Sequence, residues 1–270
     1  MFRVLPGFRL SLWFTASFLG LVVLLPLAGL MAKAATTEPV RAWSLFADPR
    51  TLAAFRVSIL ASAGAALLSI PAGLLLAWVL ERYRFPGRRV LNAVLDLPFA
   101  LPTAVAGIAL TALYVPDGWI GRVLAPAGIT VAYTPLGIGV ALLFVSLPFV
   151  VRTVQPVLAG LDRRAEEAAL ILGASPAQLF RLVILPNLVS AVGTGAALAF
   201  ARSVGEYGSV IFIAGNRPLV SEIVPLLILT RLEQYDYPGA AMLGTGMLVI
   251  SFLLLLLIDR LQRFRSVAGA

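Results

Sequence analysis

No cysteine and no histidine occur among the 270 residues of this sequence, and only 13% of its residues are charged. Without cysteine the chain forms no disulfide and has no thiolate nucleophile, and without histidine it has no imidazole base. The commonest ligands of zinc and copper are missing for the same reason. The sequence also lacks the Gly-x-x-x-x-Gly-Lys-[Ser/Thr] phosphate-binding loop, so we do not expect this chain to hydrolyse ATP itself. We predict that the chain is not an enzyme and holds no cofactor or metal.

Apolar residues make up 60% of the sequence, compared with roughly 45–50% in soluble globular domains. A membrane-spanning helix needs about 20 largely apolar residues. Six stretches meet this requirement, approximately Leu10–Met31, Leu52–Leu80, Val90–Tyr114, Tyr133–Val151, Leu188–Ala214 and Gly239–Ile258. No polar block separates them. The sequence therefore predicts an all-helical polytopic membrane protein, with about six transmembrane helices in a single domain over residues 1–270.

The first apolar stretch has a second interpretation, because Ala32-Lys33-Ala34 resembles the cleavage site of a signal peptide. The stretch is longer than the about 7–15 residues of a signal-peptide core. We therefore interpret it as the first membrane anchor.

The net charge of +8 would suit a nucleic-acid-binding protein, but the basic residues lie in short clusters between the apolar stretches. In the predicted topology, thirteen of the 21 lysine and arginine residues fall on the side of both termini and seven on the opposite side. Cytoplasmic loops of membrane proteins carry an excess of lysine and arginine. We predict a multi-pass membrane protein with both termini in the cytoplasm and no nucleic-acid partner.

A segment at about residues 153–187, between the predicted fourth and fifth spans, carries dense local signals. Asp162 is a favourable N-cap for a short helix, and Gly173 is the residue type that favours the end of one. Ser175 would begin a second helix, with Pro176 at its first position and Gln178 completing a Ser-x-x-Gln capping box. We expect two short helices joined by a tight glycine turn outside the membrane.

The same segment resembles the EAA loop of ABC importer permeases. Glu167-Ala168-Ala169 is followed by three residues, Gly173, nine residues and Val183-Ile184-Leu185-Pro186. The family pattern is E-A-A-x3-G-x9-I-x-L-P, so Val183 stands where isoleucine is usual. The resemblance implies the MetI-like permease fold. It also implies that Glu167, Ala168, Ala169 and Gly173 form a coupling element, which docks in a groove of an ATPase subunit and transmits its ATP-driven closure.

Further stretches are similar to the sulfate and molybdate branch of these permeases. They are Ala201-Arg202-Ser-Val-Gly205-Glu206-Tyr207-Gly208, Ile211-Phe-Ile-Ala-Gly215-Asn216, Asp96-Leu-Pro98-Phe-Ala-Leu-Pro102-Thr103 and Leu147-Pro148-Phe-Val-Val-Arg152-Thr-Val-Gln155-Pro156. Arg231-Leu-Glu-Gln-Tyr-Asp236-Tyr237-Pro238 is similar to the T-type (also called U-type) subunit of sulfate/thiosulfate importers rather than to the W-type subunit.

The resemblance implies a permease subunit of a bacterial-type plasma (inner) membrane that takes part in ATP-driven import of sulfate or thiosulfate. Molybdate or tungstate remains an alternative cargo, and a secondary anion transporter is an alternative class. The implied partners are a second permease, either W-type or a copy of this chain, and an extracytoplasmic sulfate-binding protein. Two ATPase subunits would bind ATP and Mg, and lipid would surround the membrane helices.

Two ionisable residues fall inside the predicted fifth span. Arg202 and Glu206 are four residues apart, so we expect them on one helix face, in its outer half. Such residues are costly in a membrane and normally face a bundle interior, a partner or a watery cavity. An arginine partly neutralised by a glutamate would attract a dianion without trapping it; the alternative is a structural ion pair. Thr103 and Asn216, from the resembling stretches, complete the candidate translocation path.

Overall fold

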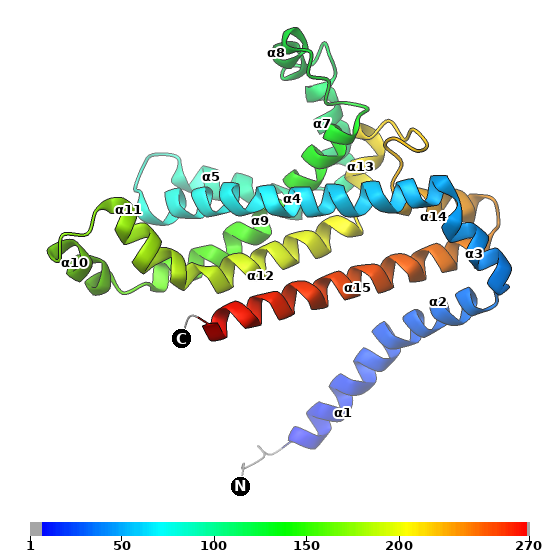
Figure 1. The fold of residues 1–270 in the computed structure, drawn as a ribbon, viewed down its shortest axis with the longest axis horizontal. Helices are drawn as coiled ribbons and strands as arrows, with labels where there is room; N and C mark the ends of the chain where they lie inside the picture. Colours follow the sequence, from blue (N-terminus) through cyan, green and yellow to red (C-terminus); the bar gives the residue numbers. More distant parts are fainter. Residues whose placement is uncertain (1–6, 269–270) are drawn as a thin grey trace.

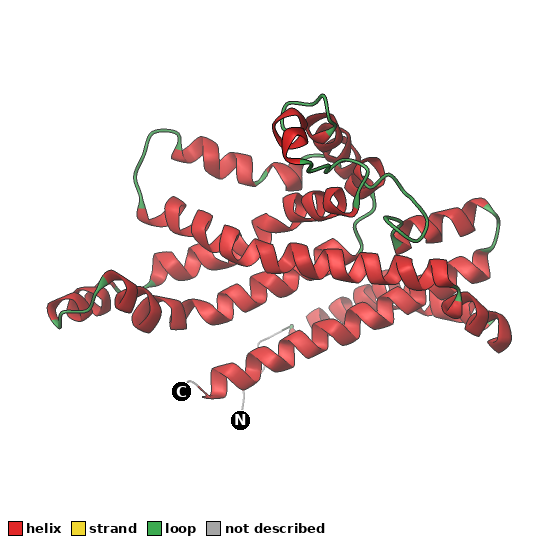
Figure 2. Ribbon diagram, turned by 45° about the horizontal axis from the view of Figure 1, so that its top comes forward, coloured by secondary structure: helices red, strands yellow, loops and turns green. Residues whose placement is uncertain are grey.

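The computed structural model describes residues 7–268, and it describes the surroundings of side chains up to residue 260. Over this part of the chain every regular element is a helix (Figure 2). Five helices are long and apolar enough to cross a membrane. They are α1–α2 (Phe8–Ala35), α4 (Pro49–Arg82), α9 (Pro135–Gly160), α11–α12 (Pro176–Val204) and α15 (Tyr237–Ala268). The predicted all-helical membrane fold is confirmed.

Two of these helices contain a π-helical turn. The turn at Gly20–Leu24 joins α1 (Phe8–Leu19) to α2 (Leu25–Ala35). A second turn, η3 (Leu179–Ile184), joins α11 (Pro176–Gln178) to α12 (Leu185–Val204). Six shorter elements connect the long helices: α3 (Pro39–Ala47), α8 (Gly121–Leu124), a 3-10 turn at Ala125–Ala127, α10 (Arg163–Ile171), α13 (Gly208–Ile213) and α14 (Val224–Glu233).

The predicted third span, Val90–Tyr114, is not one continuous helix. It consists of α5 (Arg88–Leu95), α6 (Leu97–Ala100) and α7 (Thr103–Tyr114). The chain is extended at Leu101 and Pro102, with ψ of 138° and 131°. Proline has no N–H to donate and disfavours helical geometry in the residue before it. Pro102 therefore divides an apolar stretch that hydropathy alone treats as one helix.

The predicted fifth span, Leu188–Ala214, differs at both ends from the observed helix, which covers Pro176–Val204. The helix already begins at Pro176, so the expected second short helix of the loop is the first part of a membrane-spanning helix. It ends at Val204, and α13 begins only at Gly208. Glu206 accepts a hydrogen bond from the Ser209 N–H at 2.9 Å. Because a side chain that caps the next helix competes with continuation of the previous one, the span breaks here.

The core lies between α4, α9 and α12, which run side by side (Figure 1). Its fully buried side chains include Leu80, Val150, Val154 and Leu188. A Cβ added to Gly73 would lie 2.7 Å from the Val150 Cβ, so α4 and α9 approach closely at a residue without a side chain. By contrast, α1 exposes large apolar side chains, as expected for a helix that faces lipid or another subunit.

The turn that contains α10 lies beyond one end of the bundle (Figure 1). In the same view α1 begins and α15 ends toward this end, whereas α3 and α14 lie at the opposite end. The arrangement therefore places the start of the first spanning helix and the end of the last one on the α10 side.

Candidate functional site

The projecting turn is built by the caps that the sequence predicts. The Asp162 carboxylate accepts a hydrogen bond from the Arg164 N–H at 2.9 Å and so begins α10. Gly173 has φ +83°, a value that side chains disfavour and glycine adopts freely. Ser175 and Gln178 form the reciprocal capping box, with distances of 3.3 and 2.8 Å. The turn is therefore fixed by contacts between residues that are close in the sequence.

The surface of this turn is more apolar than the matched pattern alone indicates. Glu167 and Ala168 are exposed and Ala169 is half-buried. Next to them Leu170, Ile171 and Leu172 are 51%, 86% and 87% exposed. Exposed apolar side chains grouped in this way mark contact surfaces. The sequence reasoning missed these three residues because the family pattern leaves their positions unspecified.

Arg152 on α9 holds the broken third span in place at the same end of the protein. Its Nε and Nη2 donate to the two oxygens of Asp96 at 2.9 and 2.6 Å. Its Nη1 donates to the side-chain oxygens of Asn92 and Gln155 at 2.9 and 2.7 Å. A bidentate pair of this kind fixes geometry as well as charge. Arg152 and Asp96 both lie in stretches that resemble the permease family, but their ion pair joins residues 56 positions apart and was not predicted.

Arg202 and Glu206 form an ion pair, but they do not share a helix face. Arg202 lies in the last turn of α12, whereas Glu206 lies beyond the helix end, in the break before α13. The Arg202 Nη1 is 2.6 Å from the Glu206 Oε2. The other oxygen, Oε1, accepts from both the N–H and the hydroxyl of Ser209 at 2.9 Å. The Glu206 side chain is 3% exposed and that of Arg202 is 34% exposed, so the arginine is the accessible member.

Of the other two candidate path residues, one lies at this break and one does not. Thr103 begins α7, and a Cβ added to Gly208 would lie 2.2 Å from the Thr103 Oγ1. Gly208 therefore allows α7 and α13 to meet beside the ion pair. Asn216 lies past the far end of α13, where its Nδ2 donates to the Ile211 carbonyl at 2.8 Å.

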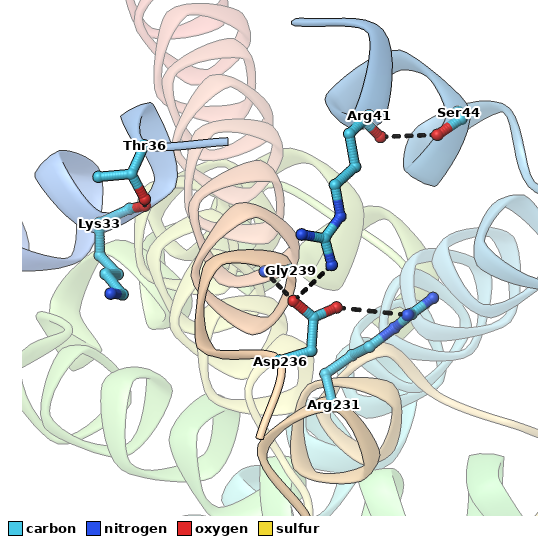
Figure 3. Close-up of polar contacts among 7 residues, drawn as sticks. All are labelled: Lys33, Thr36, Arg41, Ser44, Arg231, Asp236 and Gly239. Atoms are coloured by element: carbon cyan, nitrogen blue, oxygen red, sulfur yellow. Dashed lines mark hydrogen bonds and ion pairs between the residues drawn. The ribbon is translucent and has the colours of Figure 1, made fainter. Parts of the chain in front are cut away.

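A second polar cluster ties the helices together at the end opposite α10 (Figure 3). Asp236, just before α15, accepts from Arg41 of α3 at 2.8 Å and from the Gly239 N–H at 3.0 Å. Arg231 of α14 lies 3.4 Å from its other oxygen. Asp236 and Arg231 both belong to the stretch that is similar to T-type subunits, and the structure places them together as a brace between α3, α14 and α15.

Comparison with known proteins places the chain in a family. Residues 69–266 match the family described as "Binding-protein-dependent transport system inner membrane component". The chain belongs to this family, whose members are the membrane subunits of ABC importers. It is a multi-pass inner-membrane protein.

Individual relatives narrow the comparison. The chain is 49% identical over 269 residues to the "Sulfate transport system permease protein CysT" of Salmonella typhimurium. This match covers 99% of this chain and 97% of the Salmonella protein. It is 46% identical over 250 residues to the protein of the same name from Synechocystis sp., with coverage of 93% and 87%. A crystal structure of a bacterial ABC transporter that imports alginate is similar in fold, with a TM-score of 0.77, 15% identity and 94% coverage of both chains.

Proposed function

We propose that this chain is the membrane-spanning permease subunit of an ATP-driven sulfate importer, with thiosulfate as a related cargo. The observation that carries the proposal is 49% identity, over 99% of the chain, to a sulfate transport system permease protein. The molybdate alternative is less favoured, because relatives at 46–49% identity are named for sulfate. A secondary transporter is disfavoured by membership of the binding-protein-dependent family.

In this proposal the α10 turn docks on an ATPase subunit. Three features support it: the turn projects beyond the bundle, its conformation is fixed by its own caps, and it exposes Leu170, Ile171 and Leu172. Glu167, Ala168, Ala169 and Gly173 form the rest of the docking element. ATP and Mg would be bound by the partner ATPase subunits, and this chain would hold no cofactor.

The translocation path would pass the break between α12 and α13. Arg202 offers a positive charge that is one-third exposed, while the buried Glu206 beside it limits the strength of anion binding. Thr103 adds a hydroxyl at the same break. Asn216 remains a candidate further along the path, past the end of α13, where its amide donates to the Ile211 carbonyl.

The complete importer would contain a second permease, either W-type or a copy of this chain, two ATPase subunits and an extracytoplasmic sulfate-binding protein. Growth on sulfate tests this assignment. A bacterial strain that lacks its T-type permease and cannot use sulfate as a sulfur source should grow when this chain is expressed with its own partners, and the ATPase subunit should co-purify with it. Restored molybdate uptake in a strain that lacks its molybdate permease, without growth of the first strain on sulfate, would instead favour the alternative cargo.

We also propose that both termini and the α10 turn face the cytoplasm, as the excess of basic residues on that side suggests. The absence of native cysteine makes labelling direct. Single cysteines at the exposed positions Arg84 and Ser175 should react with impermeant thiol reagents only from the cytoplasmic side, and those at Glu38 and Pro218 only from outside. Labelling of Ser175→Cys in intact cells would contradict both the orientation and the docking role of the turn.

A further inference from the structure

The end of α4 that faces α10 carries an ion pair outside the Glu-Ala-Ala pattern. The Arg82 Nη2 donates to the Glu166 Oε1, and Glu166 directly precedes Glu167. The two residues are 84 positions apart in the chain. Their side chains are only 15% and 17% exposed, so water and salt screen the attraction weakly.

Two aromatic side chains support the arginine. The Arg82 guanidinium lies over the Trp78 ring, 5.4 Å from its centroid. Trp78 in turn meets Phe180 edge-on, with 5.8 Å between ring centroids. Phe180 belongs to η3, near the start of the spanning helix that follows α10. The end of α4, the first turn of α10 and the start of the α11–α12 helix therefore meet around one guanidinium.

The ion pair between Arg82 and Glu166 attaches α10 directly to α4. Among the side-chain hydrogen bonds and ion pairs of the described residues, it is the one that joins α10 to a membrane-spanning helix. Apart from this ion pair, α10 is attached by its chain connections and packs on η3. At its other face α4 packs along α9 and α12, the core of the bundle. A displacement of α10 thus reaches α4 most directly through Arg82 and Glu166.

We propose that Arg82 and Glu166 are positioning residues that fasten α10 to the end of α4, so that movement of α10 by the ATPase subunits also moves α4. The proposal rests on the proposed docking role of α10. The mechanical link between α10 and α4 is thus assigned to residues outside the Glu-Ala-Ala pattern. Glu167 is exposed and available to a partner subunit, whereas the neighbouring Glu166 is paired with Arg82.

A distance measurement tests the fastening without reference to the cargo. Spin labels on cysteines at Tyr83 and Ala165, both exposed and next to the pair, report the separation of α4 and α10 in the assembled importer. With Arg82 present, the distance should be the same in the nucleotide-free complex and in the ATP-bound complex with hydrolysis blocked. With Arg82→Gln, ATP binding should shift or broaden the distribution. An identical response in both proteins would overturn the proposal.

Transport measurements give the functional consequence. Arg82→Gln and Glu166→Gln should each keep the complex assembled and basal ATP hydrolysis intact, but should lower uptake per ATP hydrolysed by about tenfold. Exchanging the charges, Arg82→Glu with Glu166→Arg, should recover part of the loss. The matched control is Arg84→Gln, an exposed arginine two residues further on, which should behave like the unaltered protein.

Two results separate this proposal from its alternatives. Loss of assembly in the single variants and in the charge exchange would show a purely structural pair and would overturn the coupling role. Failure of the unaltered complex to import sulfate would contradict the proposed cargo, while the distance measurement would still decide on the ion pair.

Discussion

Replacing Gly173 with valine should leave the protein in the membrane at near-normal levels but reduce ATP-driven uptake by about tenfold or more. Gly173 has φ +83°, and an added Cβ would meet nothing within 4 Å. The effect would therefore come from the backbone alone, where a β-branched residue in this conformation is strained by about 1–3 kcal/mol. The chain would relieve the strain by distorting the turn between α10 and α11. Membrane abundance, co-purification of the ATPase subunit and sulfate uptake together measure the result.

Two further substitutions make the Gly173 test specific. Asparagine tolerates positive φ better than valine does, so Gly173→Asn should retain most of the uptake. Gly139 lies within α9, with a negative φ and no atom within 4 Å of an added Cβ, so Gly139→Val should cost little. Full uptake by Gly173→Val with the ATPase subunit still bound would mean that this turn is not the coupling element.

The caps of this turn could be predicted because each depends on residues a few positions apart. Asp162 meets the N–H of Arg164, and Ser175 meets that of Gln178. Such short-range hydrogen bonds leave a recognisable spacing in the sequence. The positive φ of Gly173 follows from the same local geometry. The family pattern located the element, and the capping chemistry gave its shape.

Ion pairs between residues far apart in the chain leave no such spacing in the sequence. Arg82 meets Glu166, and Arg152 meets Asp96, across 84 and 56 residues. A single sequence records neither pairing, since many charged residues at the membrane surface could serve as partners. Hydropathy also missed the breaks at Pro102 and Gly205, because it averages over about 20 residues and does not register a local change in backbone direction. The four-residue spacing of Arg202 and Glu206 correctly suggested contact, but on a continuous helix that the structure does not contain.

Replacing Arg202 with alanine should reduce sulfate uptake by about tenfold or more, the scale of one lost charge-assisted hydrogen bond. In the proposed path, Arg202 is the accessible positive charge at the break between α12 and α13. The substitution has a second effect: among the described residues, Ser209 alone would then still donate hydrogen bonds to the Glu206 carboxylate, which is 3% exposed. An unpaired buried charge destabilises a protein strongly. Loss of uptake by Arg202→Ala alone would therefore not separate transport from folding.

The double variant Arg202→Ala with Glu206→Gln makes that separation. Glutamine keeps an oxygen that can accept from the Ser209 N–H and hydroxyl, and it carries no charge that needs Arg202. We expect the double variant to assemble with its partners at normal levels and to hydrolyse ATP, yet to import sulfate as slowly as Arg202→Ala. Glu206→Gln alone should bind the anion more tightly and release it more slowly, lowering both the KM and the maximal rate of uptake, because Arg202 would then lack its neutralising partner. If the double variant instead imports sulfate at the normal rate, the pair serves only to join α12 to α13, and the anion crosses the membrane without Arg202.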